Sequence, residues 1–274
     1  MTDDRPARPR HHAVPRKRFG QHFLEPAWVK KLIDAVHPSH DDTFLEIGPG
    51  RGALTQPLAG RVARVIAVEI DRDLAAALPS RVPPNVRIVL GDFLDLDIAA
   101  TLRSEPLPVR VIGNLPYNVS SPILFRLLDA ADEGRTFSDA TLMLQKEVVD
   151  RVVASPGTRD YGALAIQVAL VADAERLLTL PPGAFRPPPK VTSAVVRLRF
   201  RPMNVEVGDL RTFERIVRGM FLQRRKTVRN ALKPVAASLS RSSAEMLERA
   251  GVDPGRRPET LTLADIARLS RAVL

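Results

Sequence analysis

The alternation of short β-rich runs with segments of helical spacing constrains the fold of this 274-residue chain more than any other feature. Because a parallel pair of strands needs a crossover of a dozen or more residues, such alternation is typical of a doubly wound parallel sheet. The β-rich runs are TFLEI at 43–47, RVIAVEI at 64–70, VRIVLGD at 86–92, VRVIG at 109–113 and ATLMLQ at 140–145. The sequence therefore predicts the α/β fold class.

The last third of the chain has a different pattern. Two β-rich runs, 174–180 and 193–200, flank a proline-rich connection, which predicts a hairpin at the sheet edge with its prolines in the loop. After Pro202 the β-rich runs stop and helical spacing continues, with Gly251 and Pro254 as helix stop signals. The segments that this pattern predicts are a basic, disordered tail over 1–15, a sheet domain over 16–202 and a mostly helical domain over 203–274.

A glycine cluster follows the first β-rich run. Gly48, Gly50 and Gly52 have the spacing G-x-G-x-G, whereas the dinucleotide-binding signature is G-x-G-x-x-G. Glu46 stands two residues before Gly48, and its negative charge would oppose an incoming pyrophosphate. We therefore favour a cationic ligand over a dinucleotide at this turn.

Two further carboxylates stand at the ends of the next β-rich runs. Glu69 lies 21 residues beyond Gly48, where a carboxylate accepts hydrogen bonds from the two hydroxyls of a ribose. Asp92 is placed to accept from an adenine amino group, although either acid can instead cap the following helix. Together these groups describe a pocket for a nucleoside that carries positive charge, and S-adenosylmethionine, with its sulfonium and ammonium groups, fits that description.

The fourth β-rich run delivers NLPYN, residues 114–118, to the same edge of the sheet. A simple turn is one interpretation, and a pocket for an adenine base is the other. In the second, the Asn114 side-chain oxygen and the Leu115 carbonyl accept from the exocyclic amine, and Pro116 fixes the local backbone. Tyr117 offers a stacking face, which offsets the cost of taking a base out of its helix. The motif has no strong general base, so catalysis would rest on positioning and electrostatics.

The net charge of +10 is concentrated at the two ends of the chain. Residues 1–18 carry +4 and residues 201–274 carry +7, whereas the segment between them carries −1. Dispersed basic side chains gain affinity by releasing counterions from phosphates, so a polyanion partner is favoured over a merely solvated surface.

Composition also excludes several classes of protein. No apolar run approaches the ~20 residues that span a bilayer, and no apolar stretch of a secretory signal follows the basic start, so we expect a cytoplasmic protein without a membrane partner. Cysteine is absent, and the five histidines show no metal-ligand spacing, so no metal site is predicted.

Seven segments make the chain resemble the small-subunit ribosomal RNA adenine dimethyltransferases, the bacterial family whose loss gives kasugamycin resistance. They are RKRFGQHFL (16–24), EIGPGRGALT (46–55), VEID (68–71), NLPYNVSSPI (114–123), MLQKEVVDR (143–151), AFRPPPKVTSAVVRL (184–198) and QRRKTVRNAL (223–232). The resemblance implies a Rossmann-like sheet that binds S-adenosylmethionine, over 16–202, and a smaller helical domain that binds rRNA, over 203–274. It implies dimethylation of the N6 amines of two adjacent adenines in the 3′-terminal hairpin of 16S rRNA, within the immature small subunit.

The same resemblance implies roles for individual residues. The residues that would hold the cofactor are His22, Leu24, Gly48, Glu69, Asp92 and Asn114. His22 departs from family members that have asparagine at this position, so a side-chain contact would differ. Asn114, Leu115 and Tyr117 would hold the target base from one side, and Phe185 would stack on it from the other, unless Phe185 is a core aromatic held by its prolines.

The basic segments of the chain also have implied roles. The residues that would contact the rRNA backbone are Arg224, Arg225, Lys226 and Arg229, although some of these arginines can instead join the two domains. The N-terminal segment 15–24 would combine a basic arm with a lid over the cofactor.

Two other functions stay open. One is a 23S rRNA adenine N6-methyltransferase of the macrolide-resistance type, and the segments 143–151, 185–191 and 223–230 argue against it. The other is a ribosome assembly factor without catalysis, against which the intact NLPY and acidic series speak. We expect a monomer.

Overall fold

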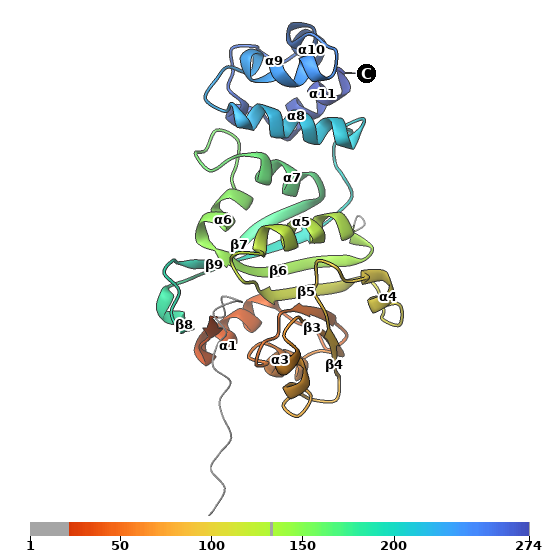
Figure 1. Cartoon of the computed structure of the whole chain (residues 1–274), viewed down its shortest axis with the longest axis vertical. Helices are drawn as coiled ribbons and strands as arrows, with labels where there is room; N and C mark the ends of the chain where they lie inside the picture. The colour runs from red at the N-terminus through yellow and green to blue at the C-terminus, as the bar shows by residue number, and fades with distance from the viewer. Residues whose placement is uncertain (1–21, 132–133, 274) are drawn as a thin grey trace, which may run out of the picture.

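The computed structural model describes residues 22–131 and 134–273 of the chain (Figure 1). The predicted tail over 1–15 and most of the N-terminal segment 15–24 therefore lie outside the described residues.

A seven-stranded sheet occupies the middle of the molecule (Figure 1). Its strands are β2 (Thr43–Ile47), β3 (Arg64–Glu69), β4 (Val86–Leu90), β5 (Val109–Asn114), β6 (Phe137–Gln145), β7 (Ala172–Leu180) and β9 (Ser193–Phe200). They stand in the order β4-β3-β2-β5-β6-β9-β7, with parallel pairing from β4 to β6 and antiparallel pairing of β9 with both β6 and β7. The predicted α/β fold class is confirmed, and so is the hairpin of β7 and β9 at the sheet edge.

Helices cover both faces of this sheet. They are α1 (Pro26–Val36), α2 (Thr55–Ala59), α3 (Arg72–Ala77), α4 (Ile98–Leu102), α5 (Ser120–Ala130), α6 (Lys146–Val152) and α7 (Ala163–Val171). Successive residues of a strand point to opposite faces. In β2, Leu45 joins a cluster that contains Leu124 of α5, whereas Phe44 joins a cluster that contains Leu32 of α1. The two clusters are the hydrophobic cores of the two faces.

The sequence did not predict α5. Pro122 and the two serines before it are typical of a loop. The helix begins at Ser120, so Pro122 stands in its first turn, where the backbone N–H groups have no partner within the helix and a missing one costs little.

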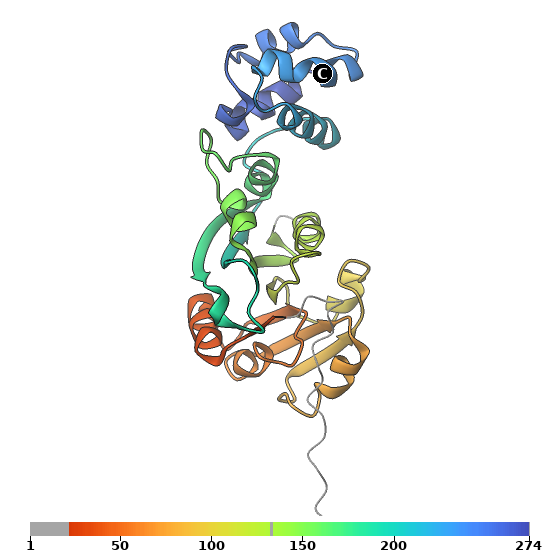
Figure 2. The ribbon, with the colours of Figure 1, turned by 60° about the vertical axis from the view of Figure 1, so that its left-hand side comes forward.

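Four helices follow the sheet and lie together at one end of the molecule in both views (Figures 1 and 2). They are α8 (Leu210–Leu222), α9 (Val228–Ser238), α10 (Ser243–Ala250) and α11 (Leu263–Arg271). The predicted stop at Gly251 is confirmed: this residue ends α10 with a φ of 62°. The hydrophobic core of these four helices also includes Ala165, Ile166 and Leu170 of α7. This core therefore includes residues that precede residue 203. The domain boundary at residue 203 stays a prediction.

A short ribbon ties the N-terminal segment to the connection between β7 and β9. β1 (Phe23–Leu24) pairs antiparallel with β8 (Phe185–Arg186), and a 3₁₀ turn, Pro182–Ala184, precedes β8. Within the part of the chain that the structure describes, no helix combines the length and apolar character needed to cross a bilayer.

Candidate active site

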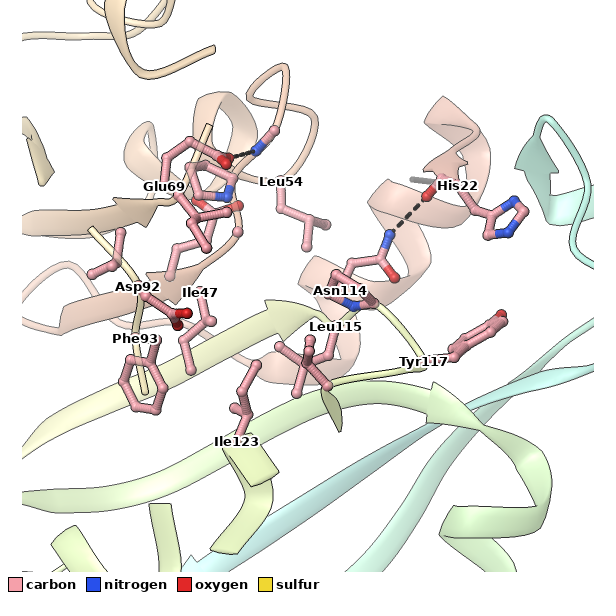
Figure 3. Close-up of a pocket in the computed structure, with 18 of the residues that line it drawn as sticks. His22, Ile47, Leu54, Glu69, Asp92, Phe93, Asn114, Leu115, Tyr117 and Ile123 are labelled. Atoms are coloured by element: carbon pink, nitrogen blue, oxygen red, sulfur yellow. Dashed lines mark hydrogen bonds between the residues drawn. The ribbon is translucent and has the colours of Figure 1, made fainter. Parts of the chain in front are cut away.

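A pocket opens at the carboxyl ends of β2, β3, β4 and β5 (Figure 3). Parallel pairing in register brings these strand ends to one edge, since Ile47 lies opposite both Val68 and Gly113. Nine of the residues predicted to bind the cofactor or the target base line this pocket: His22, Leu24, Gly48, Glu69, Asp92, Asn114, Leu115, Pro116 and Tyr117. The structure therefore brings them together, although it does not test the role of each.

Glu69 holds the glycine turn in place. One of its carboxylate oxygens accepts from the backbone N–H of Gly50 and the other from that of Asp71, each at 2.9 Å. Gly48 and Gly50 have φ values of 69° and 58°, which favour glycine. A Cβ added to Gly48 would meet nothing within 4 Å, so this glycine leaves open space beside the backbone. Each Glu69 oxygen keeps a lone pair for a ligand hydroxyl.

Glu46 is the most unusual group in the pocket. Its side chain is 1% exposed, and its Oε2 atom has no hydrogen-bond partner among the described residues. Burial raises the pKa of Glu46 to about 7; the Thr55 hydroxyl lowers it, and the negative charge of Glu69 raises it further. Thr55 Oγ1 is also buried without a hydrogen-bond partner and interacts with this carboxylate, so the Glu46 oxygen can pair with that hydroxyl or with a ligand in the pocket.

Asp92 and Phe93, after the end of β4, and Ile70, after the end of β3, line the pocket. Asp92 Oδ1 accepts from the backbone N–H of Leu94 at 2.9 Å, so part of this carboxylate stabilises its own turn. Ile70 is 47% exposed on the pocket, and Phe93 is buried beside it. The sequence analysis missed both residues, and the signal was simple: each directly follows one of the predicted acids.

The amide of Asn114 has a fixed orientation. Its Nδ2 donates to the backbone carbonyl of His22 at 3.0 Å, which leaves Oδ1 available as an acceptor (Figure 3). The backbone N–H of Leu115 donates to the carbonyl of Met143 at 3.2 Å and holds the loop on β6. A Cβ at Gly113 would lie 3.0 Å from the Ile47 carbonyl oxygen, so the residue before the motif must be small.

Tyr117 is held at its hydroxyl. Its Oη lies 2.7 Å from Oγ of Ser193, a fully buried residue at the start of β9. Burial raises the pKa of the Tyr117 phenol, which therefore stays neutral at physiological pH. The Tyr117 ring faces the His22 ring, with centroids 6.0 Å apart and planes inclined by 27°. Ser193 is a third residue that was not predicted from the sequence, and nothing in the local pattern distinguishes it.

Phe185 differs from its predicted position. The sequence analysis favoured a stacking face on the target base, with a core aromatic as the alternative. The ring is 2% exposed, lies in the hydrophobic cluster with Leu24 and Val29, and is not among the residues that line the pocket. Pairing of β1 with β8 draws it into this core, so the structure favours the core alternative: the ring would have to leave its cluster to stack on a base.

The predicted RNA-binding residues fall into two kinds. Arg224 donates from Nε and Nη2 to one carboxylate oxygen of Glu259, at 3.1 and 3.0 Å, and from Nη2 to the carbonyl of Arg159 at 2.8 Å. It therefore joins the loop after α6 to the 3₁₀ turn Pro258–Thr260, which favours the packing alternative for this arginine. In the described part of the chain, three exposed side chains of this group make no hydrogen bond or ion pair: Arg225, Lys226 and Arg229.

A family model described as ribosomal RNA adenine dimethylase matches residues 13–273 of the chain. The chain belongs to this family. The predicted family is therefore confirmed, and the match extends across the sheet and the C-terminal helices alike.

Individual relatives agree with this family. A protein of Acinetobacter baylyi named ribosomal RNA small subunit methyltransferase A is 46% identical over 93% of this chain and 91% of its own length. A protein of the same name from Aromatoleum aromaticum is 47% identical over 94% of each chain.

Two solved structures share the fold of this family member. A dimethyladenosine transferase from Plasmodium falciparum is similar with a TM-score of 0.76 and 25% identity, over 90% of this chain and 96% of that one. The 23S rRNA methyltransferase ErmE is similar with a TM-score of 0.67 and 27% identity, over 92% and 99%. The Rossmann-like methyltransferase fold is thus shown, whereas the roles of single site residues stay predictions.

Proposed function

We propose that this chain transfers methyl groups from S-adenosylmethionine to the N6 amines of two adjacent adenines in the 3′-terminal hairpin of 16S rRNA. The observation that carries the proposal is the oriented amide of Asn114, whose free Oδ1 stands in the same pocket as the acidic strand ends. An acceptor for an amine and a site for a cationic nucleoside are the two halves that adenine methylation requires. The family and the small-subunit names of its relatives support the same reaction.

The residues of the pocket fit S-adenosylmethionine. The unpartnered Oε2 of Glu46 would balance positive charge on the donor, and the open space at Gly48 would admit its chain. Glu69 would accept from the ribose hydroxyls of the donor, and Ile70 offers an exposed apolar face to the adenine ring of the donor. When bound, S-adenosylmethionine supplies a methyl carbon activated by its sulfonium.

The target amine needs orientation more than it needs a base. Its lone pair is delocalised into the adenine ring, and two acceptors for its N–H groups favour a pyramidal nitrogen whose lone pair is localised and faces the sulfonium methyl. Asn114 Oδ1 and the Leu115 carbonyl would be these acceptors, and both groups belong to a loop that Met143 and His22 hold by backbone carbonyls. Positive charge on the methylated nitrogen makes its proton acidic, so water can remove it.

The C-terminal helices are proposed as the RNA-binding region. Arg225, Lys226 and Arg229 are exposed cations without a partner among the described residues, and such side chains bind phosphates by charge. Residues 203–274 would thus hold the immature small subunit while the sheet performs the chemistry. Arg224 would act indirectly, by fixing the loop that carries Arg159.

The substrate is tested by methyl incorporation from radiolabelled S-adenosylmethionine. Small-subunit particles from cells that lack this protein should be labelled at two adjacent adenines, and naked 23S rRNA should not. Labelling of 23S rRNA alone would assign the chain to the reaction named for its more distant structural relative. Binding to the particle without any labelling would favour an assembly factor.

A further inference from the structure

One helix, α7, is shared between the sheet and the C-terminal helices and lies between them (Figures 1 and 2). Apart from Gln167, its sequence ALAIQVALV is apolar, which is typical of a helix that is buried all round. Val168 belongs to a hydrophobic cluster of the sheet, whereas Ile166 and Leu170 belong to the cluster of the C-terminal helices. The two cores therefore meet on one helix.

The carboxyl end of α7 is fixed by Arg201, the residue that follows β9. Its backbone N–H donates to the carbonyl of Val171 at 2.9 Å. Its guanidinium donates to the carbonyl of Ala169 and to the carboxylate of Asp173, each at 2.9 Å. A cation that binds the last carbonyls of a helix also complements the negative end of the helix dipole. The chain leaves the sheet for the C-terminal helices from this point, so α7 holds the start of that connection.

The loop between α6 and α7 is bound to the C-terminal helices at several points. The backbone N–H of Gly157 donates to the carbonyl of Glu259 at 2.7 Å. The buried hydroxyl of Tyr161 donates to the carbonyl of Leu261 at 2.9 Å. The Tyr161 ring meets the ring of Phe221 edge-on, with centroids 6.1 Å apart. The α6–α7 loop is therefore packed against α8 and hydrogen-bonded to the segment before α11.

Arg224 connects this loop to the exposed cations. It donates to the carboxylate of Glu259 at 3.0 and 3.1 Å and to the carbonyl of Arg159 in the loop at 2.8 Å. Arg225 and Lys226 follow it directly in the chain and are exposed. The position of these cations is thus set by the same contacts that hold the loop.

The other end of the loop leads back to the pocket through α6. This helix begins at Lys146, directly after β6, and the Lys146 N–H donates to the carbonyl of Thr192 at 2.9 Å. Met143 of β6 accepts from the N–H of Leu115, which belongs to the NLPYN loop, at 3.2 Å. A continuous series of hydrogen-bonded elements therefore runs from the pocket to the exposed cations.

We propose that α7, Arg201 and the α6–α7 loop form a rigid junction that holds the exposed cations at a fixed distance from the pocket. Only adenines at one position relative to the bound phosphates then reach the methyl donor. The inference rests on the proposed function, because it assumes that these cations bind the particle while the pocket methylates adenine. Units of one chain move against each other by default unless their interface is large and apolar, and here an apolar helix is buried in both cores. Tyr161, Arg224 and Glu259 are positioning residues in this scheme.

The test compares two double variants that break the same contact with opposite changes of charge. They are Tyr161→Phe with Arg224→Ala and Tyr161→Phe with Glu259→Ala. Both lose the hydrogen bond to Leu261 and the ion pair, but both keep a ring against Phe221. With saturating small-subunit particle, single-turnover methyl transfer should fall about 10- to 100-fold in both, the range for a displacement of about 1 Å at the reacting atoms. Mass spectrometry of the digested rRNA should also find label on adenines beyond the two adjacent ones.

Other quantities should stay near those of wild type. The Kd of S-adenosylmethionine should change by less than about 2-fold, because none of the three substituted residues lines the pocket. The Kd of the particle should change by less than about 3-fold, because the exposed cations remain. Circular dichroism should show that both variants are folded at the assay temperature. Glu248→Ala, at an exposed glutamate of α10, is the matched control for the lost carboxylate and should behave as wild type.

Two results would overturn this assignment. One is wild-type rate and wild-type positions of label in both double variants, with only a loss of stability, which would reduce these contacts to ordinary packing. The other is a change in opposite directions, with weaker particle binding when Arg224 is lost and tighter binding when Glu259 is lost, which would show that the charge of Arg224 meets the RNA. Failure of the proposed function is distinct, since wild type itself would then leave the particle unmethylated.

Discussion

Polar side chains are held by hydrogen bonds in the pocket but are exposed in the segment before α9. In the pocket, Asn114 and Tyr117 each make a hydrogen bond that fixes one end of the side chain. In the segment before α9, Arg225 and Lys226 are exposed and make no such bond among the described residues. A reacting atom needs preorganised partners, whereas a phosphate backbone accepts charge from many directions. The difference indicates that chemistry and particle binding belong to separate regions.

The strongest test of this separation is Asn114→Ala. Loss of the acceptor for the target amine should lower the rate of methyl transfer by about 10²-fold or more, by analogy with the removal of one preorganised group from an oxyanion site. Binding of the small-subunit particle should stay within about 3-fold of wild type, because Asn114 contacts no phosphate in this scheme. Filter binding and single-turnover transfer measure the two quantities. Asn204→Ala, at an exposed asparagine outside the pocket, is the control. Equal losses of binding and rate would mean that Asn114 is structural.

A second test concerns donor binding alone. Glu46→Gln removes the negative charge that would face the cationic donor and should weaken binding of S-adenosylmethionine about 10- to 100-fold, the range for a hydrogen bond to a charged group. Affinity of the wild type should also rise as pH rises through about 7, where Glu46 ionises, and the variant should lose this dependence. Calorimetry at pH 6 and pH 8 checks both expectations. If Glu46→Gln binds the donor as tightly as wild type, Glu46 is not part of the donor site.

The same substitution should stabilise the protein without its donor. The folded-state pKa of Glu46, about 7, lies above the usual glutamate value of 4.5, so the unfolded chain releases this proton first as pH rises. Wild-type stability therefore falls between about pH 4.5 and 7, and Glu46→Gln should be more stable by up to about 3 kcal/mol above that window. Chemical denaturation at pH 4.5 and pH 8 measures the difference. Glu214→Gln, on the exposed face of α8, should show none.

Charge reversal in the segment before α9 should weaken binding of the particle and leave binding of the donor unchanged. In the double variant Arg225→Glu and Lys226→Glu, particle binding should weaken by about 10-fold, and the slope of log affinity against log salt should fall by about 0.7 to 0.9 for each lost phosphate contact. Binding of S-adenosylmethionine should not change, because neither residue lines the pocket. An unchanged salt slope would show that these cations do not meet phosphate.

The smallest effect is expected at Arg224, which lies next to these cations in sequence but is paired in the fold. Arg224→Ala should lower stability by about 1 kcal/mol, since its pair with Glu259 is partly exposed. The salt slope of particle binding should stay that of wild type. A fall in that slope of about 0.7 to 0.9, as expected for one lost phosphate contact, would return Arg224 to the RNA-binding group.

Much of the acidic half of the pocket could be predicted from the sequence. Glu46, Glu69 and Asp92 each stand within one residue of the end of a β-rich run, and parallel strands in register place such ends at one edge. Asn114 follows the same rule on β5. These residues need only the fold class to be brought together, because the sheet itself sets their spacing.

The aromatic half of the pocket depends on contacts that no local pattern contains. His22 meets Pro187 across 165 positions, and Tyr117 meets Ser193 across 76. Phe185 lies in the core because β8 pairs with β1, a ribbon of two residues on each side that is too short to read from the sequence.

The chain by itself thus determined the strands of the large sheet, the acid near the end of each of its first three strands and the excess of cations near its C-terminal helices, since these follow from periodicity and composition. Tertiary structure decided which ring faces Tyr117, which way the Asn114 amide points and why Arg224 is paired while Arg225 is exposed. The physical reason is that side-chain direction and pairing depend on groups distant in sequence, which only packing brings within hydrogen-bond reach.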